Sequence, residues 1–141
     1  MKKLPSNLKK MLIDEFKFAI EKMEKEEDFD KKLYYFSALY SVLSRVFNVE
    51  FDPELVFIHL VLNTTHNTLQ SRLASIRRGE ESVIKIPEEV FEKLTNITRE
   101  LLVRIEKNRS THDVLQKLAT IAYMTTGNGY YLYERGLLRL G

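Results

Sequence analysis

Cysteine is absent from this chain of 141 residues. Without cysteine the protein can form no disulfide, no thiolate nucleophile and no zinc site built on sulfur. The absence is typical of proteins that fold in a reducing compartment, and we therefore expect a cytoplasmic protein.

Neither sign of charge dominates. The chain has 22 basic and 20 acidic residues, which are mixed along its length and give a formal net charge of +2. Nucleic-acid binders usually carry a strong basic field, so composition argues against one and leaves only a local basic patch open.

A long hydrophobic run is also lacking. The longest stretch without Asp, Glu, Lys or Arg extends from Leu55 to Ser71, but it contains His, Asn, Thr and Gln throughout. A membrane-spanning helix needs about 20 mainly apolar residues, so we expect no membrane span. The lysines near the start are not followed by the apolar core of a signal peptide.

Signatures of catalysis or cofactor binding are missing from the sequence as well. It has no phosphate-binding loop, nucleophile elbow, dinucleotide-binding glycine pattern or calcium-binding loop. We therefore expect no cofactor, and we favour a protein that is not an enzyme.

Apolar residues make up 44% of the chain, and many recur at the three- to four-residue spacing of amphipathic helices. The length fits one domain, residues 1–141. The pattern predicts an all-α, single-domain helical bundle of five or six helices with mostly antiparallel neighbours. Its expected core positions include Leu12, Phe16, Phe36, Leu43, Leu94, Leu101, Leu118 and Ile121.

Several residues predict where these helices begin and end. Ser6 is a candidate cap for the first helix, Asp28 or Asp30 for the second, and Asp52 with Pro53 for the third. Gly79 can end the third helix in a left-handed conformation. Ser110 and Asp113 suggest a start resembling a capping box for the fifth.

The segment before Pro87 has some β-forming character. Val83, Ile84 and Ile86 are β-branched, and Pro87 biases its predecessor away from helix. We interpret the segment as a crossover loop whose apolar residues hold it against the bundle. A single exposed edge strand is the alternative.

The third helix carries a seven-residue apolar repeat and, beside it, a polar strip. Leucine or isoleucine recurs every seven residues, which is typical of a helix packed lengthwise against a neighbour. Polar residues stack next to it within roughly 60° of arc. The repeat consists of Leu55, Leu62, Leu69 and Ile76, and the strip of His59, Asn63, His66 and Gln70.

The polar strip has two interpretations. The strip can be a set of hydrogen-bonded side chains that fixes the register between two helices, or a hydrated edge of the seam between α-helices packed lengthwise. In both cases its polar groups have hydrogen-bond partners, because an unpaired buried amide costs about 1–3 kcal/mol. Alternatively it lines a small-ligand pocket or an oligomer interface. A metal site is not expected: His59 and His66 are about 10.5 Å apart along the helix axis, and no histidine has a glutamate three residues before it.

Two further groups were considered as binding residues. Arg72, Arg77 and Arg78 are candidate phosphate contacts, although basic residues are also favoured at the carboxyl end of a helix. The tail is predicted to form a short sixth helix, which Gly136 weakens. One side of this helix carries an amphipathic stripe of residues that either anchors the tail to the bundle or makes oligomer contacts. That stripe consists of Tyr130, Tyr133, Leu137 and Leu140.

A comparison with the helical-bundle ribonucleases of the HEPN family does not give a match. Their hallmark is an arginine separated from a histidine by four to six residues. Here seven residues separate Arg104 from His112, and two separate Arg109 from it. The main hypothesis is a non-enzymatic bundle that forms a homo-oligomer, with a dimer favoured, or a subunit of a larger assembly. The alternatives are an RNA- or nucleotide-binding protein, including a divergent ribonuclease of this kind, and a small-molecule binder.

Overall fold

A computed structural model describes residues 4–79 and 84–140. These residues form six helices and no strand, which confirms the predicted all-α bundle. The helices are α1 (Ser6–Lys25), α2 (Phe29–Phe47), α3 (Pro53–Arg77), α4 (Glu88–Glu106), α5 (His112–Met124) and α6 (Gly127–Glu134).

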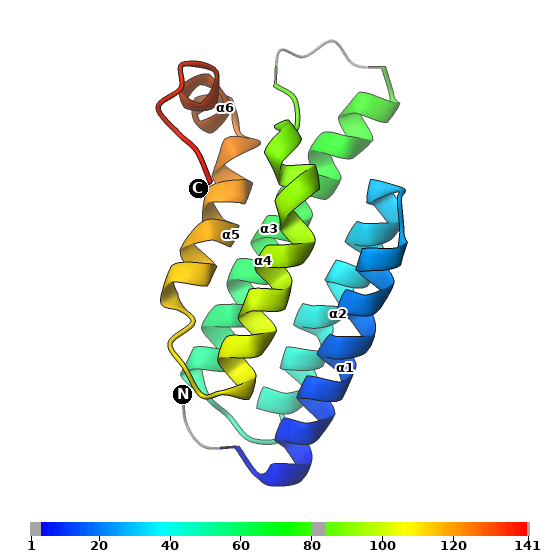
Figure 1. The fold of residues 1–141 in the computed structure, drawn as a ribbon, viewed down its shortest axis with the longest axis vertical. Coiled ribbons are helices and arrows are strands. Elements are labelled where there is room, and N and C mark those ends of the chain that lie inside the picture. The colour runs from blue at the N-terminus through cyan, green and yellow to red at the C-terminus, as the bar shows by residue number, and fades with distance from the viewer. Residues whose placement is uncertain (1–3, 80–83, 141) are drawn as a thin grey trace.

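Five of these helices form a ring around the core, in the order α1, α2, α3, α5, α4. Figure 1 shows that consecutive helices from α1 to α5 alternate in direction, so most neighbours are antiparallel as predicted. The exception is the pair α3 and α5, which run parallel because α4 separates them in sequence. The short α6 packs against α5.

Helix starts follow the sequence signals in two cases and depart from them in two. The carboxylate of Asp28 accepts a hydrogen bond from the Asp30 backbone N–H at 3.1 Å, and Asp52 caps α3 in the same way. At α1 the predicted cap is wrong, because the preceding residue is Pro5 and Ser6 already belongs to the helix.

The predicted capping box at α5 is also wrong. Ser110 Oγ accepts from the His112 backbone N–H at 3.4 Å, but Thr111 occupies the cap position. Asp113 binds Arg104 of α4 instead of the backbone ahead of it. A tertiary ion pair thus replaces a local cap.

The seven-residue repeat of α3 marks the core over most of its length. Leu55, Leu62 and Leu69 are fully buried, but Ile76 is 48% exposed, so the prediction is wrong at its last position. Figure 1 shows that the end of α3 extends past the α1–α2 hairpin, so its last turns have fewer neighbouring helices than the rest of the helix. Gly79 follows with a φ of 70°, the left-handed conformation that was expected.

The described part of the crossover before α4, residues 84–87, contributes to the core without forming a strand. Ile86 is buried and Ile84 is half-buried, as expected of a loop held against the bundle. Residues 84–87 have no regular secondary structure, and Val83 lies outside the described residues.

The tail differs from the predicted amphipathic helix. Helix α6 ends at Glu134, and Gly136, with a φ of 77°, turns the chain out of helix. Leu137 is consequently exposed, whereas Leu140 is buried and its backbone N–H donates to Glu89 Oε1 at 3.1 Å. Leu137 and Leu140 therefore do not share a helical stripe with Tyr130 and Tyr133.

Candidate functional site

The polar strip of α3 lies along the seam with α2, where it contacts a row of aromatic side chains. The His59 ring meets Tyr40 and Phe47 edge-on, with centroids 5.7 Å and 5.5 Å away. The His66 ring stacks on Phe36 at 6.4 Å and contacts Tyr40 at 5.6 Å. All four strip residues are half-buried.

Hydrogen bonds within the strip are few and local. His66 Nδ1 is 3.5 Å from the Tyr40 hydroxyl and 3.3 Å from Asn67 Oδ1, and Asn67 Nδ2 donates to Asn63 Oδ1 at 3.1 Å. Because the strip is half-buried, water can reach these groups. This half-burial favours the interpretation of a hydrated edge over that of a closed buried network.

Metal binding has no support in the geometry of the described part of the chain. Within residues 4–79 and 84–140, no cluster of three or more His, Asp or Glu side chains could hold a metal ion.

The three arginines at the end of α3 do not converge on one point. Arg72 reaches towards α5, where its Nη2 is 3.5 Å from the Thr125 carbonyl oxygen. Arg77 forms an ion pair with Asp30 of α2, and Arg78 Nη2 lies 3.5 Å from Ser75 Oγ. Phosphate binding by this group therefore stays a prediction from sequence.

The tail residues proposed as oligomer contacts mostly contact their own chain. The Tyr130 and Tyr133 rings are 6.0 Å apart, and the Arg139 guanidinium lies over Tyr133 at 4.5 Å. Burial raises the pKa of the Tyr130 hydroxyl. Only Leu137, 66% exposed, is left largely uncovered among the four stripe residues.

A surface that sequence reasoning missed lies on the outer side of α3 and α5. Phe57 and Leu60 are 49% and 54% exposed, although α3 already buries another side of itself in the core. Beside them runs a groove of about 240 Å³ between the two helices. We call this surface the α3–α5 face; the groove is lined by Phe57, Leu60, Val61, Thr64, Thr65, Ala119 and Ala122.

The α3–α5 face continues beyond the groove. A second hollow, on the other side of Ala119, is lined by Gln116, Thr120, Tyr123 and Leu138. Tyr123 is itself 44% exposed. Neither hollow is lined by a charged side chain.

Local contacts explain why α3 and α5 pack closely along this face. The Thr65 hydroxyl is fully buried, and it lies 3.0 Å from the Leu118 carbonyl oxygen of α5 and 2.8 Å from that of Val61. A donor shared between two helices fixes their register. The small side chains of Ala119 and Ala122 leave the hollow above this contact.

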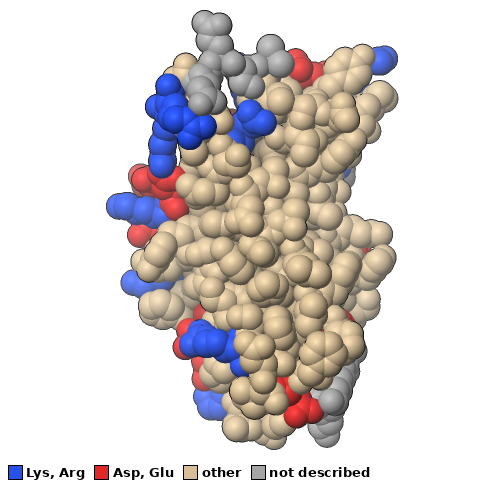
Figure 2. Space-filling model, turned by 180° about the vertical axis from the view of Figure 1, so that it is seen from behind, with Lys and Arg blue, Asp and Glu red and all other residues tan. Residues whose placement is uncertain are grey.

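Charged residues avoid this part of the surface. From behind, Figure 2 shows them mainly along one long edge and near the two ends, with a broad uncharged area between. The sequence contains a signal for this uncharged surface, which is the charge-free stretch from Leu55 to Ser71. In the described part of the chain, no helix combines the length and apolar character needed to cross a bilayer.

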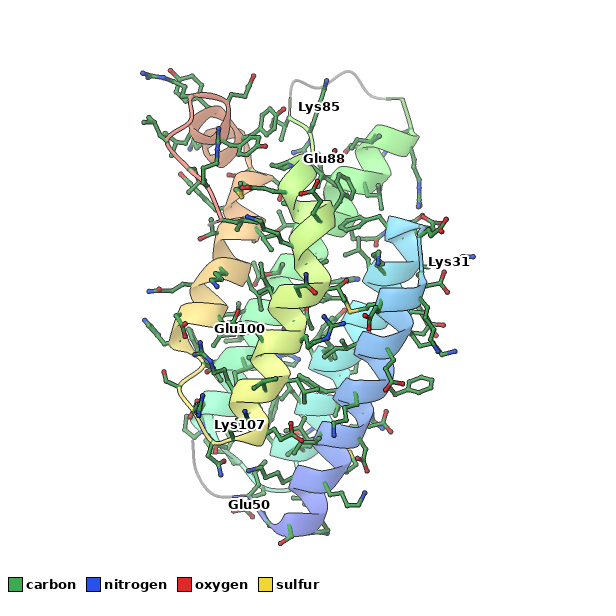
Figure 3. All side chains as sticks on the ribbon, viewed as in Figure 1. Lys31, Glu50, Lys85, Glu88, Glu100 and Lys107 are labelled. Carbon is green, nitrogen blue, oxygen red and sulfur yellow. The ribbon has the colours of Figure 1, made fainter. Side chains whose placement is uncertain are left out.

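The opposite side of the bundle is rich in charge. Figure 3 shows Glu88, Glu100 and Lys107 along α4 on the front. Arg104 donates to both carboxylate oxygens of Asp113, at 2.6 Å and 3.0 Å, and to Glu100 at 3.1 Å. The hydrogen bond from Arg104 lowers the pKa of Asp113 and raises that of Arg104 itself.

Comparisons with known proteins add no family to these observations. No protein-family model matches the chain, and neither curated proteins nor solved structures gave a significant match.

Proposed function

We propose that this protein is a self-associating helical module, without catalytic chemistry of its own, and that the α3–α5 face is its contact surface. The observation that carries the proposal is the exposure of Phe57 and Leu60 within a helix that has no charged residue from Leu55 to Ser71. A helix with apolar side chains on more than one side is usually covered on more than one side.

The composition of the face supports the same conclusion. Solvated helix surfaces normally carry charged residues, whereas the centre of a protein interface is depleted of charge and enriched in aromatic residues. Phe57, Leu60 and Tyr123 are exposed here beside two uncharged hollows. Exposed apolar surface of this kind marks interaction sites in proteins.

The face has the size of a small interface. The charge-free stretch of α3 is about 25 Å long at the rise of an α-helix. With helices about 10 Å apart, α3 and α5 together span roughly 20 Å, which gives a projected area of roughly 500 Å². A standard interface covers about 800 Å² on each partner.

The proposal is tested by measuring the molar mass in solution by light scattering. We expect a dimer for the unmodified protein and a monomer for Leu60→Glu, because a buried, unpaired carboxylate at the centre of an interface is strongly disfavoured. The matched control is Phe18→Glu. Phe18 is an apolar residue on α1 that is equally exposed, at 57%, and we expect this variant to remain a dimer.

Circular dichroism of each variant shows whether it is folded, since neither substitution changes a buried residue. A monomeric unmodified protein at millimolar concentration would overturn self-association. A dimer that tolerates Leu60→Glu but not Phe18→Glu would move the contact surface to α1.

A further inference from the structure

We infer that the partner at the α3–α5 face is a second copy of this chain, related by a two-fold axis that crosses α3 near Leu60 and makes the two α3 helices antiparallel. In this arrangement the Leu60 side chains of the two copies meet at the axis, and Phe57 of each copy faces the groove of the other. The inference rests on the proposed self-association and adds its geometry.

The face is complementary to itself. A two-fold contact brings the same patch of both copies together, so the patch must contain both the projecting residues and the hollow that receives them. Phe57 and Leu60 project into solvent, and both also line the groove. An axis between Leu60 and Val61 opposes residue 57 of one copy to residue 64 of the other, and both of these residues line the groove.

The lack of charge on the face favours a second copy as its occupant. A partner with a charged surface would leave its charges desolvated and unpaired against Leu60 and Tyr123, which is costly. A second copy presents an equally uncharged surface. Its basic and acidic residues stay at the margins, as Figure 2 shows for the face seen from behind.

The charges at the two ends of α3 favour the antiparallel arrangement. Acidic residues Glu50 and Glu54 lie at its amino end, and the basic residues Arg72, Arg77 and Arg78 lie at its carboxyl end. Glu50 is labelled at the lower end of the bundle in Figure 3. Antiparallel pairing brings acidic ends towards basic ends and opposes the two helix dipoles, whereas parallel pairing brings like charges together.

Single cysteine variants test this geometry directly, because the chain has no cysteine of its own. A disulfide requires Cβ atoms about 3.5–4.5 Å apart. Under mild oxidation we expect Leu60→Cys, at the axis, to form a covalent dimer. Ser71→Cys should not, because it lies about 16 Å further along the helix, so that two copies place their thiols about 30 Å apart.

Tyr34→Cys is the control for random collisions, since Tyr34 is exposed on α2. Cross-linking at residue 60 well above this background, with residue 71 at background, supports the inference. Cross-linking at both positions indicates parallel helices and overturns it, as does cross-linking at residue 71 alone. A dimeric mass with no cross-link at either position overturns the geometry but leaves self-association standing, whereas a monomeric mass removes both.

Discussion

At the scale of single residues, Leu69 and Ile76 occupy equivalent positions in the apolar repeat of α3 but differ in burial. Leu69 is fully buried and Ile76 is 48% exposed. We expect Leu69→Ala to lower the free energy of unfolding by about 2–5 kcal/mol, because it leaves a cavity in the core. Ile76→Ala should change it by less than about 1 kcal/mol. Chemical denaturation measures both changes. Equal losses of unfolding free energy would contradict the observation that the buried part of the repeat ends before Ile76.

His66 presents the opposite case, a polar residue at the edge of the same seam. Its Nδ1 lies 3.3 Å from Asn67 Oδ1 and 3.5 Å from the Tyr40 hydroxyl, and its ring is half-buried. When His66 is replaced, water can therefore form hydrogen bonds with these two groups. We expect His66→Leu to change stability by no more than about 1 kcal/mol in thermal denaturation at pH 7.5, since leucine can still cover Phe36. A drop of several degrees would show that the strip is a structural network.

Asp113 allows a test by titration. Its pKa is lowered, mainly by the hydrogen bond from Arg104. The ion pair therefore stabilises the folded protein fully above the ordinary pKa of 3.8. This stabilisation is lost as the pH falls through the lower pKa of the folded state. In NMR titration of the carboxyl carbon, Arg104→Gln should raise the Asp113 pKa back towards 3.8. Lys117→Gln is the control, because Lys117 binds Glu100 and not Asp113. An unchanged Asp113 pKa in Arg104→Gln would rule out the pairing.

At the scale of elements, the docking of α6 on α5 depends on Gly129. A Cβ atom at this position would lie 1.7 Å from the Tyr123 carbonyl oxygen, so α6 would have to move. We expect Gly129→Ala to lower the free energy of unfolding by about 1–3 kcal/mol, as overpacking does. Gly127→Ala is the matched control in the same helix: its Cβ would meet only Ile84 Cδ1 at 3.6 Å, so it should be neutral or slightly stabilising.

Elements set by local chemistry could be predicted from the sequence. Asp28 and Asp52 cap helices through bonds to residues two positions ahead, so the signal and its partner lie in the same short segment. The start of α5 and the course of the tail could not be predicted in this way. Asp113 is drawn to Arg104 on another helix, and Leu140 is held by Glu89, about 50 residues away in sequence.

The candidate site likewise has features that the sequence predicts and features that depend on tertiary contacts. Periodicity correctly placed the polar strip beside a seam, but it could not identify Tyr40 and Phe47 as the rings that His59 meets. The α3–α5 face was missed because it depends on two parallel helices that are not consecutive in sequence. Leu60 is two residues from each of the buried Ile58 and Leu62, so its spacing places it away from the core, but only the tertiary structure shows that it is 54% exposed beside a groove.

At the scale of the whole molecule, the tail and the α3–α5 face are rival contact surfaces that deletion can separate. Removing residues 135–141 exposes the pocket of Leu140 and breaks its bond to Glu89. We therefore expect a lower thermal midpoint. The mass in solution should stay dimeric, because Phe57 and Leu60 are untouched and the deletion takes only Leu138 from the second hollow of the face.

Leu137→Ser completes this comparison, since Leu137 is the stripe residue of the tail that its own chain leaves exposed. If the tail only anchors itself to the bundle, Leu137→Ser changes neither stability nor mass, because the side chain contributes little to the core. If the tail is the contact surface, both the deletion and Leu137→Ser reduce the mass to that of a monomer, while Leu60→Glu does not. The two patterns are mutually exclusive, so the mass of these three variants assigns association to the α3–α5 face or to the tail.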